Sequence, residues 1–193
     1  MPKIVDHEAR REEVAEIAAT LIARDGLKGL KLREVARLAG CSTSIVSHYF
    51  EGKHDLLLAA YRMRMEGTVA RVRQFSQGGA RLVDSLAQVL PLDPDRIDSW
   101  RIWLAFWGLA SADEPFLHEQ RLRSREAVDL FQTAIVNAGA MPDGEQTRLV
   151  AQALLSSAAG VATQAVYDPE NWPPERQIAI LTLMVESLIP ARK

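Results

Sequence analysis

The residues between positions 42 and 50 carry an unusual number of short hydroxyl groups and other hydrogen-bonding side chains. These residues are Ser42, Thr43, Ser44, Ser47, His48 and Tyr49. Ser and Thr are poor helix formers, so a helix made of them is expected only where its outer face has a separate task. Short hydroxyls can reach base edges in the DNA major groove, and nearby donors can hold phosphate. The segment therefore has the chemistry of a DNA recognition helix.

A tight turn between two short helices would place these side chains on one exposed face. Apolar spacing predicts a helix over residues 32–39 and a second one over 43–50, with Ser42 as its N-cap. Gly40 supplies the left-handed conformation that a turn between them needs. Two helices of this length have the dimensions of a helix-turn-helix. Cys41 would fill the space beneath the turn, or alternatively serve as a reactive thiol.

Helical patterns continue along almost the entire chain of 193 residues, and no stretch alternates apolar and polar residues as a half-buried strand does. Glycine and proline punctuation divides the chain into roughly nine helices. A first helix is expected over residues 7–25, with Asp6 as its N-cap and Gly26 at its end. A longer helix over 55–75 follows the helix-turn-helix. The predicted fold class is therefore all-α.

Charge is distributed unevenly along the chain. Residues 1–90 carry 14 Lys and Arg against 11 Asp and Glu, whereas residues 91–193 carry 9 against 14, for a net charge of −2. A weakly basic first half suits a protein that approaches phosphates with one end, although chance fluctuation would give the same asymmetry. The overall charge argues against an architectural protein that coats DNA regardless of sequence.

The remaining composition narrows the function classes. A single cysteine excludes an intrachain disulfide, no signal peptide precedes the first charges, and the most apolar window, 100–112, is too short for a bilayer. We therefore expect a cytoplasmic protein with no membrane partner. No metalloprotease, nucleophile-elbow or phosphate-loop motif occurs, and we expect no catalytic residues, metal site or cofactor. A helical enzyme with an aromatic pocket stays open as a weaker interpretation.

Three of the four tryptophans lie within eight positions, on a helix that is apolar on every side. Trp100, Trp103 and Trp107 fall on one face of this helix, and Phe106 lies beside them. The helix is either a plain core element or the wall of an aromatic pocket. Tryptophan faces attract a quaternary ammonium ion, which has no N–H donor for directed hydrogen bonds, through the ring quadrupole.

Two helices are expected near the C-terminus, over residues 144–167 and 174–189. The first is rich in small residues that permit close approach of another helix, and the second has a broad apolar stripe. This apolar surface is either buried within the chain or forms an interface with a second copy. The residues expected at that interface are Leu154, Ala158, Val161, Leu181, Val185 and Leu188.

The stretch from Leu32 to Leu57 resembles the DNA-binding domain of the TetR family of repressors. The turn glycine, Ser42, the Tyr49–Phe50 pair, Lys53 and the Leu56–Leu57 pair all fall at the family spacing. The resemblance implies a homodimer that binds a near-palindromic double-stranded DNA operator and releases it when a small-molecule effector binds. It also implies a three-helix DNA-binding domain over 1–53 and a helical ligand-binding and dimerisation domain over 54–193.

The same resemblance assigns roles to individual positions. It places base contacts at Thr43, Ser44, Ser47 and Arg33. It places phosphate contacts at His48, Tyr49 and Lys53. The chain departs from the family pattern at Leu30 and Lys31, where many members carry a capping Thr or Ser. Lys31 would then contact phosphate by its charge instead.

A narrower resemblance, to the choline-responsive repressors of glycine-betaine synthesis, rests on Met1–Lys3, Ile45–Phe50 and above all Trp103–Trp107. It implies a quaternary ammonium effector such as choline. The residues expected to hold this effector are Trp100, Trp103, Phe106 and Trp107, with Tyr61 or Tyr167 as a further wall and Asp113 as the balancing acid. A bulky lipophilic effector is the alternative within the same class of regulator.

Overall fold

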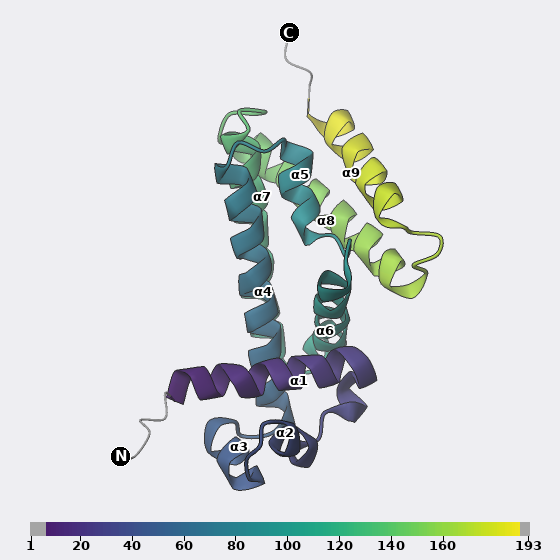
Figure 1. The fold of residues 1–193 in the computed structure, drawn as a ribbon. Helices are drawn as coiled ribbons and strands as arrows, with labels where there is room; N and C mark the ends of the chain where they lie inside the picture. Colours follow the sequence, from purple (N-terminus) through teal and green to yellow (C-terminus); the bar gives the residue numbers. More distant parts are fainter. Residues whose placement is uncertain (1–6, 190–193) are drawn as a thin grey trace.

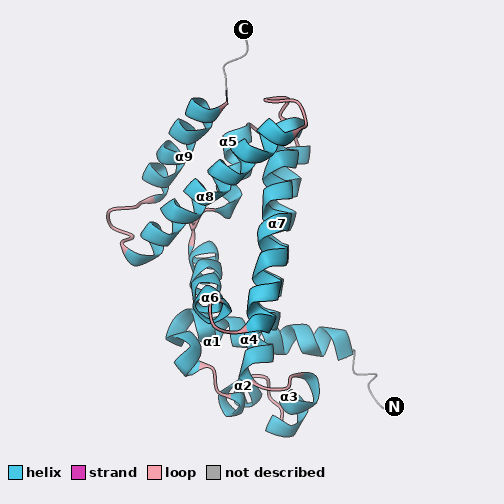
Figure 2. Cartoon of the chain, turned by 180° about the vertical axis from the view of Figure 1, so that it is seen from behind, coloured by secondary structure: helices cyan, strands magenta, loops and turns pink. Residues whose placement is uncertain are grey.

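The computed structural model describes residues 7–189, which form nine α-helices, one short 3-10 helix and no strand (Figure 2). The elements are α1 (His7–Gly29), α2 (Leu32–Leu38), α3 (Thr43–Tyr49), α4 (Lys53–Gln77), α5 (Leu82–Leu86), η1 (Ala87–Val89), α6 (Pro94–Ala110), α7 (Glu114–Asn137), α8 (Glu145–Tyr167) and α9 (Pro174–Leu188). The all-α prediction is confirmed. The N-cap expected at Asp6 and the Met1–Lys3 segment lie outside the described residues.

Helices α1, α2 and α3 lie together at one end of the molecule (Figure 1). The apolar stripe of α1 is fully buried, with Val14, Ala18 and Leu21 at most 1% exposed. The prediction that α1 ends at Gly26 is wrong in one respect. Gly26 has a φ of 65° and interrupts the helix, but helical backbone resumes beyond it and continues to Gly29. Glycine tolerates this conformation at little cost, so the helix bends at that point.

The turn between α2 and α3 has the geometry of a helix-turn-helix. Gly40 has a φ of 61°, in the left-handed region that glycine favours. The backbone N–H of Cys41 donates to the carbonyl of Ala36 at 3.0 Å, which closes the end of α2. Cys41 is half-buried against the core, as expected for a plug beneath the turn.

The long helices α4 and α7 run side by side along the molecule, while α8 and α9 lie at the end away from α3 (Figure 1). Helix α4 begins two residues earlier than predicted, at Lys53. Helix α6 contacts α1, α4, α7 and α8, so it lies at the centre of the helical packing. Helix α6 therefore joins α1 to the middle of the larger helical part.

Among the described helices, α8 meets the length and hydropathy that a membrane span requires. About 39% of its most apolar window is buried inside the protein. Core helices of soluble proteins meet the same criterion, so this feature is weak support for a membrane segment.

Candidate functional site

The polar residues of α3 form an exposed face because the apolar residues of the same helix anchor it from behind. Val46 and Phe50 are 0% and 1% exposed. The hydroxyl oxygen of Ser42 accepts a hydrogen bond from the backbone N–H of Ile45 at 3.3 Å, and so caps the helix. The polar side chains of α3 left exposed are those of Thr43, Ser44, Ser47 and His48, and the apolar Ile45 is also exposed, at 42%.

Basic side chains from neighbouring elements lie at the same end of the protein. Arg33 on α2 and Lys53 at the start of α4 are both exposed. Lys31 is exposed as well and occupies the N-cap of α2 without making a side-chain capping bond. Three exposed cations therefore lie on the elements that precede and follow α3 in the chain, and cations of this kind can bind a phosphate backbone.

Tyr49 has a partner that sequence reasoning missed. Its hydroxyl lies 3.0 Å from Nδ1 of His7, at the start of α1. The ring of His48 packs edge-on against the Tyr49 ring, with the centroids 5.3 Å apart. His7 is 42 positions away in the sequence, so no spacing rule could have found this contact. Together these contacts hold the phenol of Tyr49 in one orientation at the C-terminal end of α3.

A cavity of about 310 Å³ lies among α4, α6, α7 and α8. Its aromatic lining consists of Tyr61, Trp100, Trp103, Trp107 and Phe131. The Trp100 ring packs at steep angles against those of Trp103 and Trp107, at centroid distances of 4.8 and 5.7 Å. Its indole N–H donates to the carbonyl of Val89 at 2.6 Å. The volume lies at the small end of the roughly 300–1,000 Å³ range of ligand pockets.

Three residues expected at the pocket lie elsewhere. Phe106 is fully buried behind the wall, stacked on Tyr61 with 3.7 Å between ring centroids and 7° between planes. Asp113 is the N-cap of α7, where its carboxylate accepts from the backbone N–H of Phe116. Tyr167 is 71% exposed near the end of α8. Phe106 therefore supports the wall, and the other two residues do not reach the cavity.

The polar lining of the cavity comes from α7, which sequence reasoning did not include. Gln120, Arg123 and Ser124 all line it. The hydroxyl of Tyr61 donates to Oε1 of Gln120 at 2.7 Å, and Nε2 of Gln120 donates to the hydroxyl of Ser124 at 3.1 Å. Burial raises the pKa of the Tyr61 phenol, so this residue stays a neutral donor. The cavity thus joins an aromatic wall to a hydrogen-bonded polar one.

Glu119 is 4% exposed and joins α4 to α7 beside the cavity. Arg62 donates to both of its carboxylate oxygens, at 3.0 and 2.6 Å. Arg123 donates its Nε–H to the same carboxylate at 2.8 Å and reaches Glu126 at 2.9 Å. The hydrogen bonds from Arg62 hold the pKa of Glu119 below its ordinary value, against the opposing effect of burial. The carboxylate is therefore ionised and paired at neutral pH.

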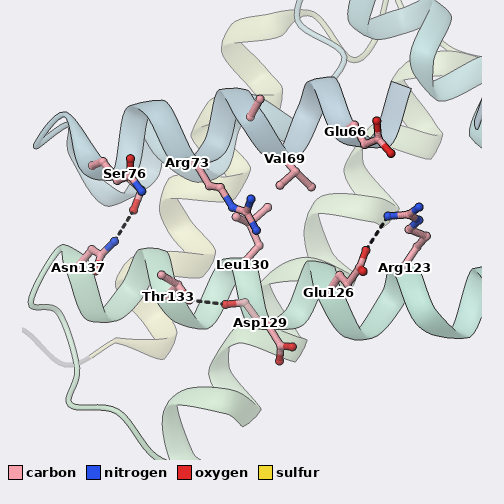
Figure 3. A pocket seen from close by; sticks show the side chains of 12 residues that line it. Glu66, Val69, Arg73, Ser76, Arg123, Glu126, Asp129, Leu130, Thr133 and Asn137 are labelled. Carbon is pink, nitrogen blue, oxygen red and sulfur yellow. Dashed lines mark hydrogen bonds and ion pairs between the residues drawn. The ribbon is translucent and has the colours of Figure 1, made fainter. Parts of the chain in front are cut away.

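A larger, open groove of about 560 Å³ follows the outer side of α4 and α7 (Figure 3). Figure 3 shows the pairing of Arg123 with Glu126 along it and the hydrogen bond from Asn137 to Ser76 across it. Arg123 lines both the groove and the aromatic cavity, as do Val69 and Leu130, so the two hollows adjoin. Within residues 7–189, no group of His, Cys, Asp or Glu side chains could hold a metal ion.

The residues expected at a dimer interface need correction, because most of them are buried within a single chain. Leu154, Ala158 and Leu181 are 0–1% exposed, and Val161 and Val185 are 7% and 8% exposed. Leu188 is half-buried. The large apolar side chains that α8 and α9 do expose are Leu149 at 57%, Leu183 at 60% and Ile178 at 37%. Of the expected residues, only Leu188 is therefore partly accessible on the surface of the single chain.

Comparison with known proteins gives two family matches. Residues 79–190 match the C-terminal domain of BetI-type transcriptional repressors. Residues 15–60 match the tetR family of bacterial regulatory proteins. The two matches cover the helix-turn-helix and helices α6, α7 and α8 of the aromatic cavity, while residues 61–77 of α4 fall between them.

Similar proteins span nearly the whole chain. The HTH-type transcriptional regulator PksA of Bacillus subtilis is 23% identical over 97% of this chain and 94% of its own length. The HTH-type transcriptional regulator BetI of Vibrio campbellii is 28% identical over 94% and 92%. A transcriptional regulator from Saccharomonospora viridis, solved in complex with choline, has a TM-score of 0.81 at 21% identity, covering 96% of this chain and 99% of that one.

Proposed function

We propose that this chain, which belongs to the TetR family of bacterial transcriptional regulators and has a BetI-type C-terminal domain, is a cytoplasmic repressor. A quaternary ammonium effector would release it from its operator. The observation that carries this proposal is the course of α4. This helix begins at Lys53, beside the recognition helix, and lines the cavity with Tyr61 and Met65. A domain boundary after residue 53 would fall at its first turn.

The mechanism that follows is geometric. In a homodimer, two copies of α3 would enter successive major grooves of a near-palindromic operator. An effector that shifts α4 changes the distance between these helices and depopulates the state that fits the operator. Effector and operator then bind different states of the same dimer.

On the DNA side, we assign base contacts to Arg33 on α2 and to Thr43, Ser44 and Ser47 on α3. Phosphate contacts are assigned to Lys31, Ser42, His48, Tyr49 and Lys53. The support for these roles is exposure, since all these side chains except the half-buried Tyr49 are exposed at one end of the molecule. Selection from random duplexes should enrich one near-palindromic motif, and enrichment of no motif would contradict the assignment.

On the effector side, the support is the aromatic wall and the relative solved with choline. The faces of Trp100, Trp103 and Trp107 would attract a quaternary ammonium at roughly 0.5–2 kcal/mol each. Phe106 would keep Tyr61 in place from behind, at 3.7 Å between ring centroids. A permanent cation without N–H donors suits such a wall better than it suits a polar site.

Titration calorimetry with choline and with 3,3-dimethylbutanol tests this assignment. The two molecules have nearly the same shape, but the second has carbon in place of the charged nitrogen. We expect choline to bind at least tenfold more tightly. Equal affinity, or no choline binding at millimolar concentration, would favour a plain hydrophobic pocket for a lipophilic effector.

We also propose that two copies pair through α8 and α9. The support is the exposed apolar surface of these helices, including Leu149, Ile178 and Leu183. Obligate dimers commonly bury more than ~2,000 Å² in total, which two helices from each copy can supply. Dimerisation would give the protein the two-fold symmetry that a near-palindromic operator requires.

A further inference from the structure

The aromatic cavity contains hydrogen-bond donors that a quaternary ammonium group cannot satisfy. The indole nitrogens of Trp103 and Trp107 are both buried, and neither has a hydrogen-bond partner among residues 7–189. The N–H of Trp107 lies near the Tyr61 hydroxyl without a well-directed hydrogen bond to it. Buried polar groups in native proteins are nearly always paired, so an unpaired indole N–H in a cavity wall can take an acceptor from a ligand or from a water molecule. Trimethylammonium has no acceptor atom.

The formal charge of the lining has the wrong sign for a simple cation. Among the described residues that line the cavity, Arg123 alone is charged. Its contacts with Glu119 and Glu126 use two of the five N–H donors of the guanidinium and fix its position. Neither carboxylate lines the cavity itself. A ligand would thus meet a positive guanidinium that still has donors to offer.

Two other polar side chains of the lining, those of Gln120 and Thr68, are already engaged. The amide of Gln120 accepts from Tyr61 and donates to Ser124. The hydroxyl of Thr68 donates to the carbonyl of Arg64 and accepts from Arg71. The charged donors that remain for a ligand belong to Arg123, and the uncharged ones include the indole N–H groups of Trp103 and Trp107 and the hydroxyls of Ser124 and Ser156. These donors together suit an anionic acceptor.

We propose that the effector is a zwitterion, in which a quaternary ammonium group contacts the tryptophan faces and a carboxylate accepts from Arg123 and from the indole N–H groups. The large angles between the rings, 64° for Trp100 and Trp103 and 87° for Trp100 and Trp107, let one cluster offer both ring faces and N–H edges. This inference rests on the proposed function, because it takes the cavity to be the effector site. The inference adds to that function a carboxylate on the effector, as the second charged group that the lining binds.

Calorimetry with four probes on the full-length protein separates the two charges. The probes are choline, trimethylglycine, the methyl ester of trimethylglycine and 3,3-dimethylbutanoate. The ester keeps the cation without the carboxylate charge, and the butanoate keeps the carboxylate with carbon in place of nitrogen. We expect trimethylglycine to bind at least tenfold more tightly than each of the other three. Choline or the ester binding as tightly as trimethylglycine would overturn the inference.

Two variants locate the selectivity. Trp103→Phe keeps an aromatic face but removes the N–H, and Arg123→Met keeps the apolar stem but removes the charge. Each should weaken trimethylglycine binding about tenfold and change choline binding less than threefold. Arg121→Met is the control, since Arg121 lies on the same helix as Arg123 and pairs with Glu114 but does not line the cavity. It should retain the preference for trimethylglycine, with folding of every variant checked by circular dichroism.

The outcomes distinguish this inference from the proposed function. In one outcome, choline binds, Trp107→Leu abolishes its binding, and trimethylglycine binds no more tightly than choline. The cavity is then the effector site, but the zwitterion inference is wrong. If none of the four probes binds to the folded protein, both the inference and the assignment of a quaternary ammonium effector are wrong. If Arg121→Met loses selectivity as fully as Arg123→Met, the selectivity does not arise from contact with Arg123, and the inference again fails.

Discussion

Arg62 on α4 donates two hydrogen bonds to the buried carboxylate of Glu119 on α7, at 3.0 and 2.6 Å. Arg62 follows directly after Tyr61, which lines the aromatic cavity. The ion pair therefore fixes the position of α4 relative to α7 at the level of the cavity. Any shift of α4 that accompanies effector binding has to strain or rearrange this pair.

Replacing Glu119 with Gln should destabilise the protein by about 2–4 kcal/mol. Removing one member of a buried pair typically costs about 3–5 kcal/mol, and the 45% exposure of the Arg62 side chain reduces that cost here. Urea unfolding at pH 7 measures the change. Glu126→Gln is the matched control, since Glu126 also pairs with Arg123 but is 46% exposed, and should cost less than about 1 kcal/mol.

The same pair gives this variant a pH signature. Because the folded pKa of Glu119 lies below its unfolded value of about 4.3, the stabilisation is present above that value and is lost as pH falls through the folded pKa. The stability difference between wild type and Glu119→Gln should therefore shrink as pH is lowered from 7 toward 3. A difference that stays constant over this range would show that the ionised carboxylate is not its source.

Base and phosphate contacts should respond differently to substitution. Ser47→Ala should change the preferred operator sequence at one position, with a loss of roughly 1–3 kcal/mol for the preferred base pair. Lys53→Ala should weaken binding to all duplexes alike. It should also reduce the slope of log affinity against log salt concentration by about one, since one phosphate contact is lost. Fluorescence anisotropy with operator and scrambled duplexes at several salt concentrations distinguishes them. Identical behaviour of the two variants would contradict the assigned roles.

The contact between Tyr49 and His7 should be visible as energetic coupling on DNA. Tyr49→Phe should weaken operator binding by about 0.5–1.5 kcal/mol, because it removes one hydroxyl hydrogen bond. If His7 acts by orienting that hydroxyl, His7→Ala should cause a loss only while the hydroxyl is present. A double-mutant cycle measures this, and strictly additive losses would show that His7 does not position Tyr49.

Charges placed on neighbouring positions of α9 should have opposite consequences. Leu183 is 60% exposed, so Leu183→Glu should give folded monomers with weakened operator binding. Val185 is 8% exposed, so Val185→Glu should instead unfold the chain. Analytical ultracentrifugation and circular dichroism separate the two effects. Leu122→Glu is the control, since the Leu122 side chain on α7 is 44% exposed, and this variant should leave the dimer intact. If Leu183→Glu still forms dimers, the interface lies elsewhere.

The helix-turn-helix could be predicted from the sequence because its determinants are local. Gly40 in the turn and Ser42 at the N-cap act within a few residues of themselves, and the structure has both in those roles. The tryptophan face of α6 was also visible, because helical periodicity places positions 100, 103 and 107 together. The bend at Gly26 was missed in part, since a glycine that ends one helix does not reveal whether another helical turn follows it.

Pairing between distant helices could not be predicted in the same way. Gln120, Arg123 and Ser124 have the spacing and polarity of a solvent-exposed helix face, yet they line the cavity because α7 turns that face toward α4. Leu181 and Leu183 are equally apolar, yet they are 1% and 60% exposed. Only the packing of α9 against its own chain decides which of them is available to a second copy.

Release of DNA by a ligand in the aromatic cavity is the central claim, and one titration tests it most directly. A labelled operator selected from random duplexes is bound by the protein, and its anisotropy is followed as choline or trimethylglycine is added. We expect full release by the wild type, and release by Trp107→Leu only at concentrations at least tenfold higher, with unchanged operator affinity in the absence of ligand. Retention of operator at saturating ligand, or equal release from both proteins, would contradict the claim.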